Sequence, residues 1–220
     1  MALNCKADLR DNSNWSKECG TCNKCSPVSA LQYPFERDLE NSKMLIEEIK
    51  EFIHNTTGLF CRETEELKKP DLIVEDANDK LIARVESKFL EGKAFMKVDK
   101  MLEDSLKPKE TLVVDEPKLL SYFSCKEDDS KRLEHSIPIF VVWKFDRPCY
   151  DVGGICVYQE IDILRVIYSD KGARRKFRRK TASSDYVSGE RMGIIDKYHF
   201  SISECKPIES LPEDLLNAAR

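Results

Sequence analysis

The feature that most constrains the fold is the stretch from Pro70 to Lys88, which has the pattern of two short β-strands joined by a tight turn. One apolar run covers residues 72–74, and a second covers residues 81–85. The segment between them is rich in Asp and Asn, which favour turns because their side chains bond to the nearby backbone. We therefore expect a β-hairpin whose two-residue turn is centred on Asn78-Asp79.

Such a hairpin would gather charged side chains at its open end. Asp71 would lie opposite Glu86, with Cβ atoms about 5 Å apart. Lys88 would share their face because side chains alternate along a strand. Neighbouring carboxylates repel each other unless a cation lies between them, and a hard divalent cation such as Mg2+ binds carboxylate, water and phosphate oxygens. A lysine beside it can orient or deprotonate water, or neutralise charge on the phosphate, so the set suits phosphodiester hydrolysis.

Pro70-Asp71, followed after a hairpin by Glu86-Ser87-Lys88, resembles the PD-(D/E)xK nuclease superfamily, which includes restriction endonucleases and Holliday-junction resolvases. The resemblance implies that Asp71 and Glu86 are ligands of Mg2+ or Mn2+ and that Lys88 is the catalytic lysine. It further implies that Ser87 lends its backbone carbonyl to the metal. The implied activity is that of a Mg2+-dependent endodeoxyribonuclease, although the sequence does not separate endonuclease from exonuclease.

The same superfamily implies a restriction-endonuclease-like α/β fold, in which helices flank a mixed central sheet. The resemblance is strongest from Phe35 to Lys100 and covers the rest of the chain by general layout. It also implies an acidic residue on the first helix near the metal, and the sequence leaves four candidates for it: Glu36, Glu40, Glu47 and Glu48.

Other interpretations of the hairpin stay open. Both short motifs arise by chance in a chain in which 35% of the residues are charged, and an acidic pair on a strand face is often only solvated. The chain would then be a catalytically inactive nucleic-acid-binding protein on a nuclease scaffold, or an RNA-directed partner protein in a larger complex.

Apolar periodicity predicts alternating helices and strands along the rest of the chain. A continuous apolar run predicts a central strand buried on both faces at Ile137–Phe145. The other predicted strands are Leu59–Arg62, Thr111–Val114, Ile155–Tyr158 and Tyr198–Ser203; the predicted helices are Phe35–His54, Phe89–Ser105, Lys118–Phe123, Ile161–Ser169 and Leu211–Ala219; Lys126–Glu134 is predicted to be a charged loop.

Two basic segments are candidates for contacts with a nucleic-acid backbone. Residues 171–180 hold seven basic side chains, which is unusual in an acidic chain, and the predicted helix after the hairpin carries further lysines. Solvated helix faces are the alternative interpretation. The candidate contacts are Lys93, Lys97, Arg174, Arg175, Lys176, Arg178 and Arg179.

The N-terminal part, residues 1–32, is polar and carries closely spaced cysteines. Cys19, Cys22 and Cys25 are separated by two residues each, and Cys5 would complete a tetrahedral site. Zinc is the first candidate and an iron–sulfur cluster the second. A tail without metal is the alternative. The remaining cysteines, scattered through apolar segments, are expected to be reduced thiols.

Composition limits the remaining function classes. A chain of 220 residues has room for a main domain, at residues 33–220, and the cysteine-bearing appendage. The net charge of -4 excludes a global attraction to nucleic acid, so DNA binding would depend on local patches. Because the chain lacks a run of 18 apolar residues and a signal-peptide pattern, we expect a soluble, cytoplasmic protein without membrane contact. A homodimer and a larger complex both stay open.

Overall fold

The computed structural model describes residues 3, 35–66, 68–91, 98–146, 154–178, 186–187, 190–191 and 196–220. The helices are α1 (Phe35–Thr57), α2 (Val98–Met101), α3 (Glu116–Leu133), α4 (Ile161–Lys171) and α5 (Leu211–Ala218). The strands are β1 (Phe60–Glu63), β2 (Leu72–Glu75), β3 (Leu81–Glu91), β4 (Thr111–Asp115), β5 (Ile139–Asp146), β6 (Cys156–Glu160), β7 (Lys176–Phe177), β8 (Tyr186–Val187), β9 (Glu190–Arg191), β10 (Lys197–Ser201) and β11 (Lys206–Pro207).

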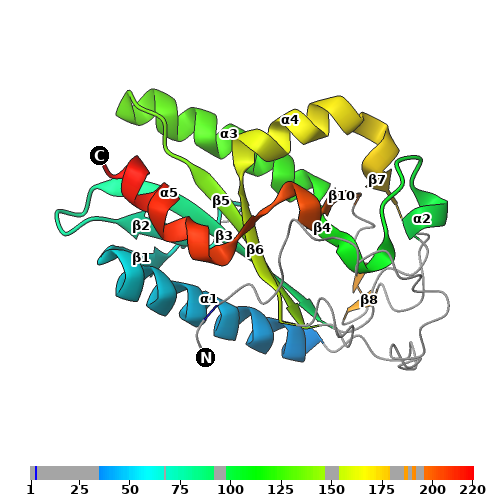
Figure 1. Ribbon diagram of the computed structural model, residues 1–220, viewed down its shortest axis with the longest axis horizontal. Helices are drawn as coiled ribbons and strands as arrows, with labels where there is room; N and C mark the ends of the chain where they lie inside the picture. The colour runs from blue at the N-terminus through cyan, green and yellow to red at the C-terminus, as the bar shows by residue number, and fades with distance from the viewer. Residues whose placement is uncertain are drawn as a thin grey trace.

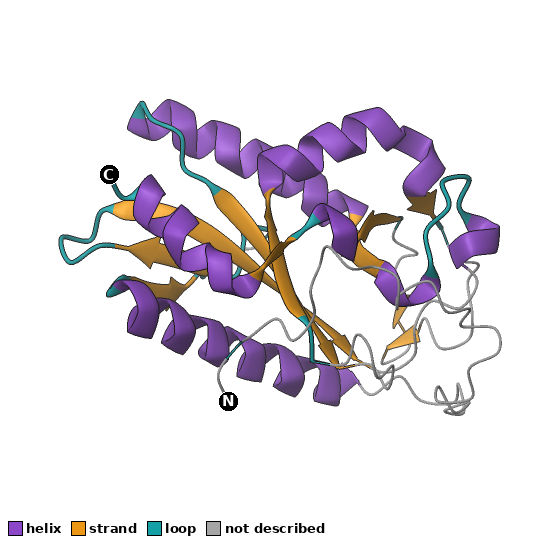
Figure 2. Ribbon diagram, viewed as in Figure 1, coloured by secondary structure: helices purple, strands orange, loops and turns teal. Residues whose placement is uncertain are grey.

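A mixed six-stranded sheet in the order β1-β2-β3-β5-β6-β11 forms the centre of the molecule (Figure 1, Figure 2). The first three strands form an antiparallel meander, β3 and β5 are parallel, and β5, β6 and β11 are again antiparallel. A parallel pair needs a long crossover connection, and here that connection contains α3. The predicted α/β fold with a mixed central sheet is confirmed.

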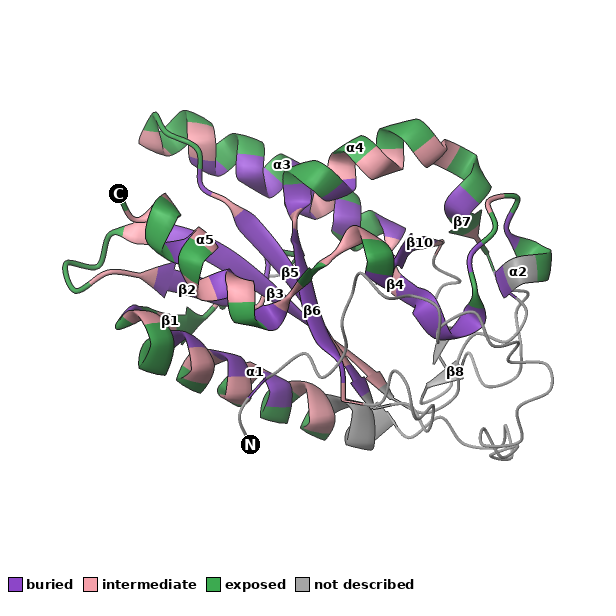
Figure 3. Cartoon of the chain, in the orientation of Figure 1, coloured by how far each residue is buried: buried purple, intermediate pink, exposed green. Residues whose placement is uncertain are grey.

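Helices cover both faces of this sheet, so its central strands are buried on both sides (Figure 3). On one face α1 and α5 pack over an apolar cluster that includes Leu45, Ile49 and Leu215. On the other face α3 and α4 pack over a second cluster that includes Trp143 and Leu164. The prediction of a continuously buried strand is confirmed at β5, because neighbouring residues of this strand contribute to clusters on opposite faces.

Helix α1 follows from its apolar spacing. Leu45, Ile49 and Ile53 recur every four residues and are almost fully buried, and each such side chain contributes roughly 1.5–3 kcal/mol to stability. The helix ends where Gly58 takes a φ of +74° and donates its N–H to the His54 carbonyl at 2.9 Å. That left-handed conformation suits a residue without Cβ.

The sequence predictions for two segments are wrong. Residues 89–91 continue β3 rather than starting a helix, and among the described residues up to 105 the helical segment is only Val98–Met101. The strand continues because parallel pairing with β5 extends from Arg84–Ile139 as far as Glu91–Asp146. The segment Lys126–Glu134, expected as a charged loop, is almost entirely the second half of α3.

Charged residues in this half of α3 have partners that are distant in the sequence. The buried Lys126 ammonium lies 2.7 Å from Glu160 and 2.5 Å from Asp162, at the start of α4. Asp129 is buried against Arg84 of β3. These tertiary contacts allow a segment rich in charged residues to pack as a helix against the protein interior. By composition alone, the same segment resembles a solvated loop.

No described helix is long and apolar enough to cross a membrane. Cys61, Cys125, Cys156 and Cys205 are free thiols, as expected for those positions. The predicted cysteine-rich appendage, with Cys5, Cys19, Cys22 and Cys25, lies outside the described residues.

Candidate active site

The hairpin of β2 and β3 sets the geometry of the site. Its register pairs Leu72 with Val85, and the next two residue pairs continue this antiparallel match. The predicted two-residue turn at Asn78-Asp79 implies the same register for residues 72–74 and 83–85. Extending it by one residue places Asp71, the residue before β2, opposite Glu86.

The turn itself differs from the prediction. Glu75 pairs with Leu81, so the register shifts by one residue next to the turn. The Asp76 N–H donates to the Lys80 carbonyl at 3.1 Å, which leaves a loop of three residues, 77–79, instead of two. The Asp76 carboxylate accepts the backbone N–H of Asn78 at 2.8 Å, and Asp79 takes a φ of +60°. This is the bulged three-residue hairpin in which one loop residue is left-handed. The irregularity is confined to the turn, so the pairing at the open end is unaffected.

Glu86 is the most deeply buried acid of the site, with 0% of its surface exposed. Its Oε1 accepts a hydrogen bond from Lys88 Nζ and lies 3.9 Å from Lys118 Nζ. Its Oε2 is also buried and accepts no hydrogen bond from a described residue, although the Tyr122 hydroxyl of α3 lies near the Glu86 carboxylate. A buried carboxylate oxygen without a partner costs free energy, so this atom suits a ligand that would approach it.

The electrostatic surroundings of Glu86 follow from this burial. Burial raises the pKa of the Glu86 carboxyl above its ordinary value, Lys88 opposes the rise, and the negative charge of Asp71 adds to it. Lys118 also opposes it. The pKa of the nearby Tyr122 hydroxyl is raised by burial and then by the Glu86 charge, so the phenol stays protonated at neutral pH. The site thus holds a carboxylate for which additional positive charge would be favourable.

Asp71 is only half-buried and is oriented by Ser87. Its Oδ2 accepts the backbone N–H of Ser87 at 2.8 Å and the Ser87 hydroxyl at 2.7 Å. The sequence suggested a role for the Ser87 carbonyl but not for its hydroxyl. Because the N–H and C=O of a strand residue point to the same neighbour, the Ser87 carbonyl also faces the Asp71 side of β3.

Helix α3 contributes two residues that sequence reasoning missed, Lys118 and Tyr122. They are four residues apart and lie on the helix face that packs over β3. Asp129, seven residues beyond Tyr122, continues this face and pairs with Arg84. The available signal was a polar and aromatic stripe at helical spacing, but the short helix predicted for this segment ended before the stripe was complete.

Two solved structures are similar to this chain at low sequence identity. The structure is similar to the Holliday junction resolvase Hjc of Archaeoglobus fulgidus, with a TM-score of 0.40 and 8% identity over 79% of this chain and 96% of that chain. It is also similar to D212, a nuclease from a fusselovirus, with a TM-score of 0.41 and 14% identity over 84% of this chain and 92% of that chain. No family model matches the chain, and no curated protein matches its sequence significantly.

Two of the candidate glutamates on the first helix pair with lysines. Glu47 pairs with Lys50 at 2.7 Å, and Glu48 pairs with Lys144 of β5. Lys144 lies beside Phe89 in the register, and Phe89 packs on the α1 face, opposite to the α3 face that Glu86 occupies. Glu40 is exposed, and the side chain of Glu36 lies outside the described residues.

The basic segment is largely engaged in ion pairs within the chain. Arg175 is buried and bonds to Asp104 at 2.5 Å and Glu204 at 2.7 Å, so its guanidinium is directed inward. Arg178 forms two bonds to Asp196, at 2.5 and 2.7 Å. The role predicted for Arg175 as a phosphate contact conflicts with its burial, because its donors are committed to the fold.

The other basic candidates differ in position. Lys176 lies 2.6 Å from Glu116, whereas Arg174 is exposed and donates to carbonyls at the end of α4. Lys93, Lys97 and Arg179 lie outside the described residues. Of this group, Arg174 is the described side chain that is exposed and has no carboxylate partner in the described chain.

The donor set of the site fits a hard cation. Asp71 and Glu86 supply carboxylates, one of them with an oxygen that lacks a partner in the described structure. No group of three or more His, Cys, Asp or Glu residues that could hold a metal occurs in the described part of the chain. A cation here would therefore bind two carboxylates and backbone, with its remaining positions free for water or substrate.

Proposed function

We propose that this protein is a divalent-metal-dependent nuclease that hydrolyses phosphodiester bonds in DNA. The observation that carries the proposal is the buried Glu86 carboxylate: one of its oxygens has no hydrogen-bond partner among the described residues, Lys88 bonds to the other oxygen, and Asp71 lies next to it. A stable core would place apolar side chains at such a position, so a polar group left unsatisfied there points to function.

The carboxylates of Asp71 and Glu86 and the carbonyl of Ser87 would hold Mg2+ or Mn2+. When bound, such an ion lowers the pKa of its water and stabilises charge on phosphoryl oxygens. Ser87 contributes by fixing the Asp71 carboxylate with two hydrogen bonds, so that this carboxylate is oriented before a ligand arrives. Burial under α3 excludes bulk water from Glu86 and strengthens the electrostatic interactions there.

Lys88 would act at the phosphate. Its ammonium is mostly buried, with 19% of the side chain exposed, and it bonds to Glu86. From this position Nζ can donate a hydrogen bond to the attacking water or to a phosphate oxygen, and its charge offsets the negative charge that develops during attack. Lys118 lies on the same side of Glu86 and adds positive charge to the site.

A supercoiled-plasmid nicking assay tests this function. Wild-type protein should nick the plasmid with Mg2+ and not with EDTA, and Asp71→Ala or Lys88→Ala should reduce the rate by about 100-fold or more while leaving folding intact. Asp128→Ala and Lys131→Ala are matched controls, because both residues are exposed on α3. Unchanged nicking in the first two variants would reject the site. DNA binding without nicking under any divalent ion would instead identify an inactive binding protein.

Two finer assignments have their own tests. Cleavage of DNA and RNA of equal length, compared at one salt concentration, would show which nucleic acid is preferred. Symmetric cutting of both strands would require a dimer, which sedimentation of the intact chain would detect. Zinc or iron bound through Cys5, Cys19, Cys22 and Cys25 belongs to the same proposal, and elemental analysis of the purified protein tests it.

A further inference from the structure

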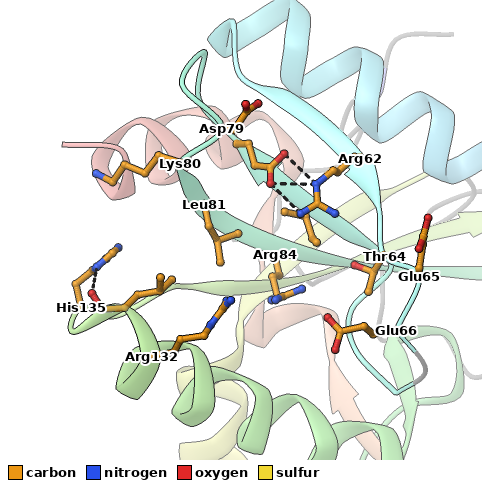
Figure 4. A pocket seen from close by; sticks show the side chains of 13 residues that line it. Arg62, Thr64, Glu65, Glu66, Asp79, Lys80, Leu81, Arg84, Arg132 and His135 are labelled. Carbon is orange, nitrogen blue, oxygen red and sulfur yellow. Dashed lines mark hydrogen bonds and ion pairs between the residues drawn. The ribbon is translucent and has the colours of Figure 1, made fainter.

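A cavity of about 500 Å3 lies beside the hairpin (Figure 4), and neither Asp71 nor Glu86 is among the residues that line it. Its walls come from the end of β1, the β2–β3 hairpin and the C-terminal end of α3. Arg84 of β3 and Arg132 of α3 extend into the same space, and Thr64, which follows β1, lies across from them (Figure 4). The cavity thus brings hydrogen-bond donors together from separate parts of the fold.

Arg84 is 3% exposed and only part of its guanidinium is bonded. Its Nε donates to Asp129 Oδ2 at 2.6 Å and its Nη2 to Asp129 Oδ1 at 3.3 Å. Its Nη1 is buried and has no hydrogen-bond partner in the described structure, and the same holds for the hydroxyl oxygen of Thr64. Native proteins rarely leave two such groups unsatisfied, so their meeting in one cavity points to a ligand with acceptor oxygens.

The charges around these donors favour an anion. Asp129 is shared between Arg84 and Arg132, whose Nη2 lies 3.0 Å from Asp129 Oδ1. One carboxylate therefore faces two guanidinium groups, which leaves one positive charge in excess. Of the acidic residues that line the cavity, Glu75 is bonded by Arg62 and Glu66 by Lys69.

The remaining acidic groups at the cavity, Glu65 and Asp79, are exposed. Water screens these carboxylates, whereas the Arg84 guanidinium is shielded from solvent by its burial. An anion at Arg84 would therefore interact more strongly with the buried positive charge than with the exposed negative ones.

We propose that this cavity is a phosphate-binding subsite. Arginine is the residue best suited to phosphate oxygens because its planar donors bind them in pairs. The Thr64 hydroxyl, Arg84 and Arg132 surround the space from different sides, which suits a tetrahedral anion better than a planar carboxylate. The volume exceeds that of a bare phosphate and leaves room for the sugar or base to which a phosphate ester is attached.

The position of the cavity connects it with the candidate active site. Arg84 and Glu86 are two residues apart on β3 and both face α3, so their Cα atoms are separated by roughly 6.6 Å. A DNA strand with one phosphate near Glu86 could therefore place another phosphate group in the cavity. This extension rests on the proposed nuclease function, whereas phosphate binding itself does not.

Calorimetric titration with inorganic phosphate, in metal-free buffer, tests the subsite. Wild-type protein should bind phosphate in the millimolar range or tighter, and Thr64→Val and Arg132→Gln should each weaken binding by about fivefold or more. Both variants keep the buried Arg84–Asp129 pair and are expected to fold. Lys131→Gln, an exposed neighbour of Arg132 outside this cavity, should bind like wild type. Absence of binding to wild type, or binding unchanged in both variants, would overturn the proposal.

A second titration identifies the source of the phosphate and separates this proposal from the nuclease assignment. The phosphate titration is carried out without metal, so its outcome does not depend on whether the protein cleaves DNA. If the subsite holds a DNA phosphate, Arg132→Gln in EDTA weakens binding of single-stranded DNA and lowers its salt slope by about one. If only inorganic phosphate binding falls, the subsite holds a free phosphate or nucleotide. Either result supports the subsite, provided that the phosphate titration succeeds.

Discussion

Replacement of Asp129 by Asn should strongly destabilise the fold. Asp129 and Arg84 are each 3% exposed, and their bond of 2.6 Å lies between α3 and the central strand β3. The amide has nearly the shape of the carboxylate, so the change removes charge without creating a cavity. It leaves the Arg84 guanidinium buried without a counterion, and removal of one partner of a buried pair costs about 3–5 kcal/mol.

The loss of stability predicted for Asp129→Asn can be measured, and it should depend on pH. For a chain of this length, a loss of about 3–5 kcal/mol corresponds to a fall in Tm of about 10 °C in scanning calorimetry at pH 7. Burial alone would raise the pKa of Asp129, but the bonds and charge of Arg84, followed by those of Arg132, outweigh it and hold the pKa below its ordinary value. The stabilisation is therefore present at neutral pH and is lost as pH falls through the depressed pKa, so the two proteins should converge in acid.

Two control variants decide whether the reasoning holds. Asp128→Asn, at the exposed neighbouring position on α3, should change stability by less than about 0.5 kcal/mol. The double variant Arg84→Met with Asp129→Leu, which removes both charges, should recover most of the loss. A fall in Tm of only a degree or two for Asp129→Asn would refute the claim that this buried pair joins α3 to the sheet.

Three further predictions follow from other buried groups. Glu86→Gln should raise Tm by a few degrees at pH 8 but not at pH 4. Because the folded state raises the pKa of Glu86, this carboxyl stabilises the fold fully below its unfolded pKa, and the stabilisation is lost as pH rises through the folded pKa. A lower Tm of the variant at pH 8 would contradict this. Thr64→Val should stabilise the phosphate-free protein by about 1 kcal/mol in urea unfolding, since its buried hydroxyl lacks a partner in the described structure, and equal or lower stability would count against it. Arg175→Met should lower the free energy of unfolding in urea by about 2–3 kcal/mol, because two carboxylates lose their counterion. Arg174→Met, at an exposed position, should leave this free energy nearly unchanged. Equal effects would show that burial does not distinguish the two arginines.

The open end of the hairpin could be predicted from sequence because its determinants are local. Two short apolar runs and the turn between them, which is rich in Asp and Asn, indicate which residues of β2 and β3 face each other. The three-residue loop with left-handed Asp79 and the bulge beside it were missed, since a two-residue and a three-residue loop have similar composition. The error remained local because the bulge lies between Val74 and Glu75, beyond the pairs that position Asp71 and Glu86.

Contacts between distant segments were beyond the reach of sequence patterns. The extension of β3 to Glu91 depends on pairing with β5, which lies more than fifty residues further along the chain. Phe89 fits a helical face as well as it fits a strand, so periodicity alone favoured the wrong element there. The positions of Lys118 and Tyr122 over Glu86 likewise depend on how α3 packs against the sheet.

Charge composition was misleading where ions pair internally. The density of arginines around Arg175 suggested an exposed phosphate-binding surface. In the structure, Asp104 and Glu204 pair with Arg175, and Asp196 pairs with Arg178. A basic segment in an acidic chain has many candidate partners, and sequence gives no ranking among them. Burial is what separates Arg175 from Arg174 in the structure.

Electron paramagnetic resonance of bound Mn2+ reports whether Asp71 and Glu86 form a divalent-cation site. Mn2+ prefers oxygen ligands, so it reports the carboxylate site rather than the N-terminal thiols. Wild type and Asp128→Asn should bind Mn2+ alike, whereas Asp71→Asn and Glu86→Gln should each weaken binding by about tenfold or more. Equal Mn2+ affinity in all four proteins would contradict the claim that Asp71 and Glu86 form a divalent-cation site.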